Sequence, residues 1–130
     1  MEELCSFFKE CGMFFVATMD GDQPRVRPFG ALNVFEGKLY IQTGKSKDVS
    51  KQMAKNSKIE ICASKEDKWV RVQATAVNDD RVEAKESMLD QNPSLKEMYS
   101  ATDDNTQVLY LKDAIATFST LAGESKEVRF

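Results

Sequence analysis

The spacing of apolar residues changes along the chain, and each change predicts a new element. Near the start, apolar side chains recur three and four residues apart, at Leu4, Phe7, Phe8 and Cys11. This spacing predicts a short amphipathic helix over residues 2–11, which Gly12 ends. Residues 13–19 form a β-rich apolar run, and such a run predicts a strand buried on both faces.

Polar turns divide most of the remaining chain into alternating strands. The Asp20-Gly21-Asp22 turn joins the first strand to a long partner, in which Gly30 predicts a bulge or bend. The Glu36-Gly37 turn leads into the next strand, and a turn is expected near Lys112 within the last one. The predicted strands cover residues 13–19, 23–35, 38–42, 58–63, 69–77 and 108–120.

Three helical segments follow the first one. Ser46 is a suitable N-cap for a helix over residues 47–55, and Asn78-Asp79-Asp80 precedes a helix over residues 81–91, followed by a short helix through Tyr99. Because hairpin turns dominate and crossover helices are few, the order predicts a mainly β fold with flanking helices rather than a doubly wound one. We expect a single domain over residues 1–130, since no linker or repeat interrupts the chain.

Composition limits the classes of function. The chain has 18 basic and 21 acidic residues and a net charge of −3, whereas nucleic-acid-binding domains are usually strongly basic. It contains no histidine, which removes Ser-His-Asp and Cys-His nucleophile systems and histidine-ligated metals. An enzyme of this composition must use other groups or a cofactor.

Cysteine usage and the apolar runs bear on location. The three cysteines are odd in number and lack metal-type spacing, so we expect reduced thiols in a cytoplasmic protein. Charged residues interrupt the N-terminal segment where a signal peptide would need an apolar core. No apolar run is long enough to span a bilayer, so we expect no membrane partner.

The strand that contains Arg25 and Arg27 is the first candidate site. These arginines are two residues apart, so their side chains point to the same face of a strand. A pair of buried charges needs an anionic partner, although arginines on a barrel strand also commonly face water and pair with carboxylates. Pro24 and Pro28 remove two backbone donors and favour an edge or bulged strand, where a ligand ring could meet backbone groups.

The loop from Thr43 to Lys47 is the second candidate. It combines hydroxyls, a glycine, two lysines and the start of a helix, which together suit a phosphate group. A P-loop is excluded because its first glycine would fall at Leu39. The alternative is a solvated lysine cluster with an ordinary helix cap.

Two further features have more than one interpretation. Trp69 is either a core or interface aromatic, or a ring that lies against a planar cofactor. The lysines at 45, 47, 51, 55 and 58 favour a solvated helix face. A nucleic-acid surface is the alternative, but it would need interleaved aromatic residues that are absent.

Four motifs resemble those of the pyridoxamine 5′-phosphate oxidase-like, FMN-binding split-barrel superfamily, near the NimC/NimA-type proteins. The most specific motif is Gln23-Pro24-Arg25-Val26-Arg27-Pro28-Phe29-Gly30, and the others cover residues 14–21, 37–43 and 69–72. The resemblance implies a six-stranded antiparallel split β-barrel with Greek-key-like topology, and a homodimer with FMN in a groove between subunits. It places the FMN-binding residues at Arg25, Val26, Arg27, Pro28, Gln42, Thr43, Lys45, Ser46, Lys47 and Trp69.

The resemblance implies a flavin-dependent oxidoreductase that acts on a small-molecule electron donor or acceptor. No catalytic side chain is identified, because the flavin carries the redox chemistry. Authentic pyridoxamine 5′-phosphate oxidase activity is not expected, since no basic C-terminal segment is present to bind that substrate's phosphate. The alternatives are a non-catalytic flavin carrier or sensor, a deazaflavin-binding relative, or a haem-binding relative that would lack a histidine ligand.

Overall fold

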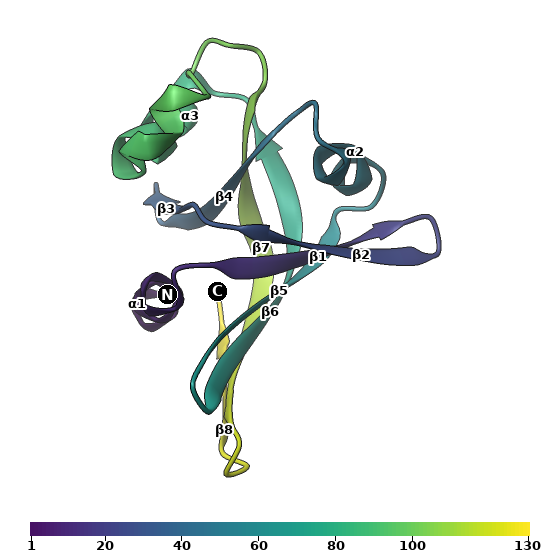
Figure 1. The fold of residues 1–130 in the computed structure, drawn as a ribbon, viewed down its shortest axis with the longest axis vertical. Coiled ribbons are helices and arrows are strands. Elements are labelled where there is room, and N and C mark those ends of the chain that lie inside the picture. Colours follow the sequence, from purple (N-terminus) through teal and green to yellow (C-terminus); the bar gives the residue numbers. More distant parts are fainter.

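The computed structural model describes residues 1–130, which are organised around one antiparallel sheet (Figure 1). The strands follow the order β2-β1-β5-β6-β7-β4-β3, and β8 pairs with β7. The strands are β1 (Phe14–Asp20), β2 (Gln23–Phe29), β3 (Leu32–Phe35), β4 (Lys38–Gly44), β5 (Lys58–Lys65), β6 (Lys68–Asp79), β7 (Thr106–Thr120) and β8 (Ser125–Arg129). The helices are α1 (Glu2–Cys11), α2 (Asp48–Lys55), α3 (Val82–Gln91) and the 3-10 helix η1 (Pro93–Glu97).

The predicted fold class is confirmed: the protein is mainly β, and its antiparallel sheet has the split-barrel arrangement. The sheet does not close, because β2 and β3 each have a neighbour on one side only. It has eight strands rather than six, for two reasons. The predicted strand over residues 23–35 divides into β2 and β3, and residues 125–129 form an additional strand.

The division between β2 and β3 occurs at Gly30, where a bulge or bend was expected. Up to Phe29 the chain pairs with β1, and from Leu32 onward it pairs with β4 instead. Phe29 packs against Phe14, with 6.0 Å between ring centroids, so the end of β2 is tied to the core. Gly30 therefore lies between two strands that have different partners.

Strand β7 runs through the centre of the sheet (Figure 1). It pairs with β6 on one side, and on the other with β4 in its first half and β8 in its second half. Asp113 has a positive φ of 53°, and the pairing with β6 shifts register between Gln73 and Thr75. The turn expected near Lys112 is thus a local irregularity in a continuous strand.

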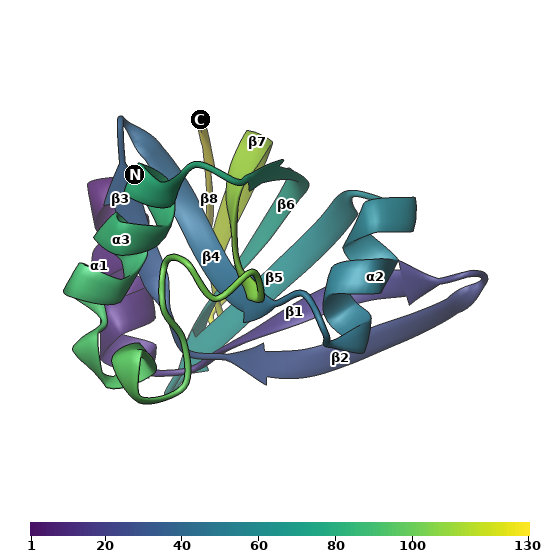
Figure 2. The same cartoon turned by 90° about the horizontal axis from the view of Figure 1, so that it is seen from above.

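The helices cover the sheet in separate places. Helix α2 lies beside the β1–β2 hairpin, at the right in Figure 2, and α1 and α3 lie at the other end of the molecule, at the left. Helix α1 contributes Leu4 and Phe8 to the main core, and α2 contributes Val49 and Met53. Helix α3 covers a smaller cluster built around Tyr40. None of the helices combines the length and apolar character needed to cross a membrane.

Two helices begin one residue later than the approximate starts that the sequence predicts. Helix α2 begins at Asp48 with Lys47 as its N-cap, and α3 begins at Val82 with Arg81 as its N-cap. Neither cap residue forms a side-chain capping hydrogen bond. Ser46 is therefore not a cap, and this change leaves the first turn of α2 open.

Candidate functional site

Arg27 lies on β2 with its guanidinium tucked between β1 and α2. Its Nη1 donates to the Val16 carbonyl oxygen at 3.0 Å and to Thr18 Oγ1 at 2.8 Å, and its Nη2 donates to Gln52 Oε1 at 2.7 Å. All three acceptors are neutral, and no carboxylate forms an ion pair with this side chain. Burial and the neighbouring Arg25 lower the pKa of Arg27, yet an arginine remains protonated in proteins. The half-buried site therefore carries a positive charge that the chain does not neutralise.

Arg25 has a different environment from Arg27. Its Nε lies 3.3 Å from Asp20 Oδ2, and both side chains are about half exposed, at 53% and 51%. An ion pair this exposed contributes little to stability. Arg25 borders the same pocket as Arg27, so the structure brings the two arginines together, but only Arg27 lacks a charged partner.

Strand β2 is an edge strand, and its prolines determine which backbone groups remain available. Pro24 and Pro28 pair with Met19 and Phe15 of β1. Because proline has no N–H, these positions face the free edge rather than the β1 ladder. Val26 lies between them in the same alternation and is 68% exposed. Its N–H is thus the one backbone donor that residues 24–28 present on this edge.

The loop between β4 and α2 is held by Asn105. The Lys45 N–H donates to the Asn105 carbonyl oxygen at 2.7 Å, and the Ser46 N–H donates to Asn105 Oδ1 at 3.0 Å. Lys47 N–H donates to the Gly44 carbonyl oxygen at 3.0 Å. The first N–H groups of a helix have no acceptor within it, so those of Asp48 and Val49 remain available. A helix N-terminus with free N–H groups favours an anion.

Two pockets meet at Arg27 and Lys47. The first, of about 310 Å³, extends from these residues toward η1 and is lined by no carboxylate. The second, of about 490 Å³, lies between β2 and the start of α2 and includes Asp20 and Asp48. The first pocket alone combines both cations with a wall free of acidic groups, so it suits an anionic ligand.

Seven of the ten predicted residues border these pockets, namely Arg25, Val26, Arg27, Pro28, Gln42, Thr43 and Lys47. Lys45 lies outside both of them and forms an ion pair with Asp80 at 3.3 Å. Ser46 also lies outside, and its N–H is used by Asn105. The structure therefore does not bring the side chains of Lys45 and Ser46 to the site.

Trp69 lies in a separate pocket that shares no residue with those at Arg27. That pocket, of about 490 Å³, also contains Phe7 and Phe118, whose ring centroids are 6.2 Å apart. Within one chain, Trp69 is thus not part of the Arg27 site.

Sequence reasoning missed several residues that shape the site. Gln52 lies on the inner side of α2 and binds Arg27, while Tyr99 lines the first pocket and Asn105 fixes the loop. Helical spacing places Gln52 one turn after Asp48, which was a usable signal. No comparable signal identified Asn105, because it acts across 59 residues of sequence.

Fold and site together define a class: an open antiparallel split barrel with a positively charged pocket beside an edge strand. A family model described as pyridoxamine 5′-phosphate oxidase matches residues 1–129. The chain therefore belongs to the pyridoxamine 5′-phosphate oxidase family.

Solved structures agree with this assignment. A NimC/NimA family protein from Clostridium acetobutylicum is 44% identical, with a TM-score of 0.96 over 100% of this chain and 92% of that one. General Stress Protein 26 from Bacillus anthracis is 15% identical, with a TM-score of 0.75 over 98% and 97% of the two chains. A heme binding protein from Mycobacterium smegmatis is also 15% identical, with a TM-score of 0.70 over 98% of this chain and 57% of that one. The latter two show the fold alone, and no curated protein matches the chain.

Proposed function

We propose that this protein binds FMN at Arg27 and Lys47 and acts as an FMN-dependent oxidoreductase on a small molecule. The observation that carries the proposal is the half-buried Arg27 guanidinium, whose acceptors on the chain are all neutral. The phosphate of FMN would supply the missing negative charge through charge-assisted hydrogen bonds. Membership in the pyridoxamine 5′-phosphate oxidase family supports this choice of anion.

The residues at the site divide between the two ends of the ligand. Arg27, the Lys47 ammonium and the N–H groups of Asp48 and Val49 would hold the phosphate. The free edge of β2 would meet the ring, with the Val26 N–H as donor to its polar rim. When bound, FMN would supply hydride or single-electron transfer, while the protein provides binding and orientation. No side chain is assigned a catalytic role.

We also propose that the site is completed by a second copy of the chain in a homodimer. Pro28, Phe15 and Cys62 lie side by side across β2, β1 and β5, and Phe15 is 45% exposed. A second copy would bury this apolar row and could bring Trp69 of the partner subunit toward the flavin ring. All three cysteines are free thiols, which favours a cytoplasmic location.

The first test is retention of flavin. Protein saturated with FMN and then desalted should keep flavin absorbance, and loss of all absorbance from the unmodified protein would overturn the proposal. Consumption of NADH or NADPH by the loaded protein, with a small-molecule acceptor present, would separate an enzyme from a flavin carrier. Haem, added in parallel, serves as the competing ligand.

The Lys47→Ala variant tests the phosphate end. Lys47 is exposed and forms no ion pair, so the variant should fold normally. Loss of one charge-assisted contact should weaken FMN binding by about ten- to a hundredfold, or roughly 1.5–3 kcal/mol. Lys55→Ala, at the other end of α2 and outside both Arg27 pockets, is the matched control. Equal FMN affinity in the two variants would contradict the phosphate assignment.

A further inference from the structure

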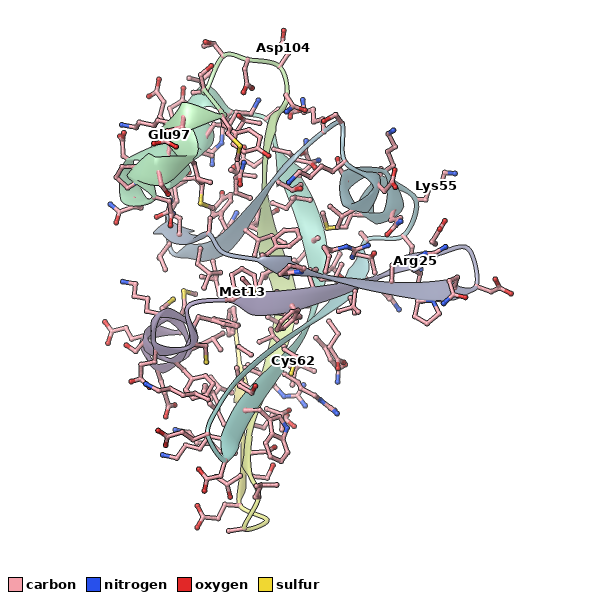
Figure 3. The ribbon with its side chains drawn as sticks, in the orientation of Figure 1. Met13, Arg25, Lys55, Cys62, Glu97 and Asp104 are labelled. Atoms are coloured by element: carbon pink, nitrogen blue, oxygen red, sulfur yellow. The ribbon has the colours of Figure 1, made fainter.

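Asp103 organises the segment that precedes β7, whose tip is marked by Asp104 (Figure 3). Its Oδ1 accepts the N–H groups of Asn105 at 2.9 Å and Thr106 at 2.7 Å, and its Oδ2 accepts the Ser100 N–H at 2.9 Å. Although burial acts to raise the pKa of Asp103, the hydrogen bonds from Thr106, Ser100 and Asn105 hold it well below its usual range. One charged carboxylate thus fixes both ends of residues 100–106.

Asn105 connects this segment to residues 45–47, the loop proposed to bind the phosphate. Its carbonyl oxygen and Oδ1 accept the N–H groups of Lys45 and Ser46, at 2.7 and 3.0 Å. These are the residues directly before Lys47, the N-cap of α2. Because both contacts go to backbone groups, they restrain the path of the loop rather than the side chains of Lys45 and Ser46.

Gly44 shows how closely the two segments approach. A Cβ built on Gly44 would lie 3.0 Å from Asn105 Nδ2 and 3.3 Å from the Tyr99 hydroxyl. A larger residue would therefore push Asn105 away from the loop. The absence of a side chain at position 44 lets Asn105 sit directly against the strand end that leads to Lys47.

We propose that Asn105 is a positioning residue that places Lys47 and the first turn of α2 for a phosphate group, and that Asp103 holds Asn105 in place. The proposal rests on the proposed FMN function and extends it. Asn105 forms hydrogen bonds with the loop before α2 and lines neither of the Arg27 pockets, so it would act on the phosphate end alone. The pair therefore determines the preference for FMN over riboflavin, which has the same ring without the phosphate.

The test compares the affinities of FMN and riboflavin in the Asn105→Ala variant. Loss of one loop hydrogen bond should lower the FMN-to-riboflavin affinity ratio by about three- to tenfold. The affinity for riboflavin itself should stay near that of the unmodified protein. A general loss of structure would weaken both ligands equally, so the ratio separates positioning from instability. An unchanged ratio in a folded variant would overturn the inference.

Two neighbouring aspartates on the same loop provide a second test, in which electrostatics and positioning predict opposite changes in FMN binding. Asp103→Asn and Asp104→Asn each remove one negative charge, but only Asp103 accepts backbone hydrogen bonds. Simple electrostatics predicts tighter FMN binding in both variants, whereas positioning predicts a lower FMN-to-riboflavin ratio in Asp103→Asn only. If Asn105→Ala does not fold, the comparison of Asp103→Asn with Asp104→Asn tests the inference instead. An equal effect of the two substitutions on the FMN-to-riboflavin ratio would refute the role of Asp103 and Asn105.

The two proposals fail in different ways. If the unmodified protein retains neither FMN nor riboflavin, the proposed function is wrong and the inference falls with it. If it retains FMN but the ratio does not respond to the substitutions, only the positioning role is wrong.

Discussion

At the scale of single residues, the site is defined by which charges are already paired. Arg81 pairs with Glu36 and Asp79, and Arg25 pairs with Asp20. Arg27 has hydrogen bonds but no carboxylate. Among these three arginines, it alone offers its full charge to a ligand while being held in place by neutral acceptors.

Asp48 is the one acidic residue in the first turn of α2, and it borders a pocket with Arg27 and Lys47. Its carboxylate should repel a phosphate, so Asp48→Asn should tighten FMN binding by about two- to fivefold. The gain should shrink at high salt because solvent screens exposed charges. Titrations of FMN and riboflavin at two salt concentrations would check this, and weaker FMN binding in the variant would contradict it.

Asp79 links Tyr40 and Arg81 near the start of α3. Its Oδ2 accepts the Tyr40 hydroxyl at 2.8 Å and lies 2.9 Å from Arg81 Nη2. The Arg81 hydrogen bonds, helped by Tyr40, lower the pKa of Asp79 from 3.8 to about 2. Burial and the Asp79 hydrogen bond raise the pKa of Tyr40 to about 12.

These shifts predict how stability depends on pH. Because the folded-state pKa of Asp79 is depressed, its contribution is fully present above about pH 4 and is lost as pH falls toward about 2. Asp79→Asn should lower the free energy of unfolding at neutral pH by about 1–3 kcal/mol, and this deficit should shrink over that acid range. Denaturant unfolding at several pH values would measure it, with Asp22→Asn in the exposed β1–β2 turn as control. A deficit that does not change with pH would contradict the role of the charge.

At the scale of elements, local patterns located most strands and helices. The 13–19 run, the alternation after Lys58 and the helix ending near Lys55 follow from side-chain periodicity alone. The predictions that failed concern features set by pairing with strands far away in the sequence. The change of partner at Gly30 is set by β1 and β4, and residues 125–129 form a strand because β7 supplies a free edge.

The same limit applies to the site. Arg27 and Lys47 could be proposed from the sequence because charge, proline and loop composition are local signals. The hydrogen bonds of the Ser46 N–H and the Lys45 ion pair with Asp80 were not, because their partners lie far along the chain. Trp69 lines a separate pocket in the single chain, so its predicted contact with the flavin depends on a second chain, and one sequence cannot locate such a contact.

The free edge of β2 provides a test that belongs to this scale. Val26→Pro removes the one outward N–H between the two existing prolines, and it leaves the β1 ladder intact. The variant should fold, yet it should bind FMN and riboflavin more weakly and by about the same factor, because the proposed position of the ring is next to the lost donor. The loss should be about three- to tenfold for each ligand. Val26→Ala, which keeps the N–H, is the control, and unchanged affinities in Val26→Pro would refute contact between ring and edge.

At the scale of the whole molecule, the surface near the β2 edge of the sheet differs from the surface near the β3 edge. The face over β2, β1 and β5 exposes Phe15 and Val26, whereas Val34 is exposed on β3 at the opposite edge. Only the first face adjoins the Arg27 pockets. We therefore expect the second copy of the chain to bind there.

Phe15→Glu would place a charge in this apolar row. Burial of an unpaired carboxylate is costly, so the variant should be monomeric in sedimentation experiments and should lose most FMN affinity. Val34→Glu, a substitution at a similarly exposed position (48%), should leave both assembly and binding unchanged. A dimeric, FMN-binding Phe15→Glu protein would show that the copies meet elsewhere.

The separation of Trp69 from Arg27 has a practical consequence. Trp69 is the sole tryptophan in the chain, so all indole fluorescence comes from the pocket shared with Phe7 and Phe118. A flavin bound on its own subunit lies among residues that do not line that pocket. The part of the quenching by FMN that grows with protein concentration would then report a flavin brought close to the neighbouring subunit's indole, and its concentration dependence would measure how tightly the subunits associate.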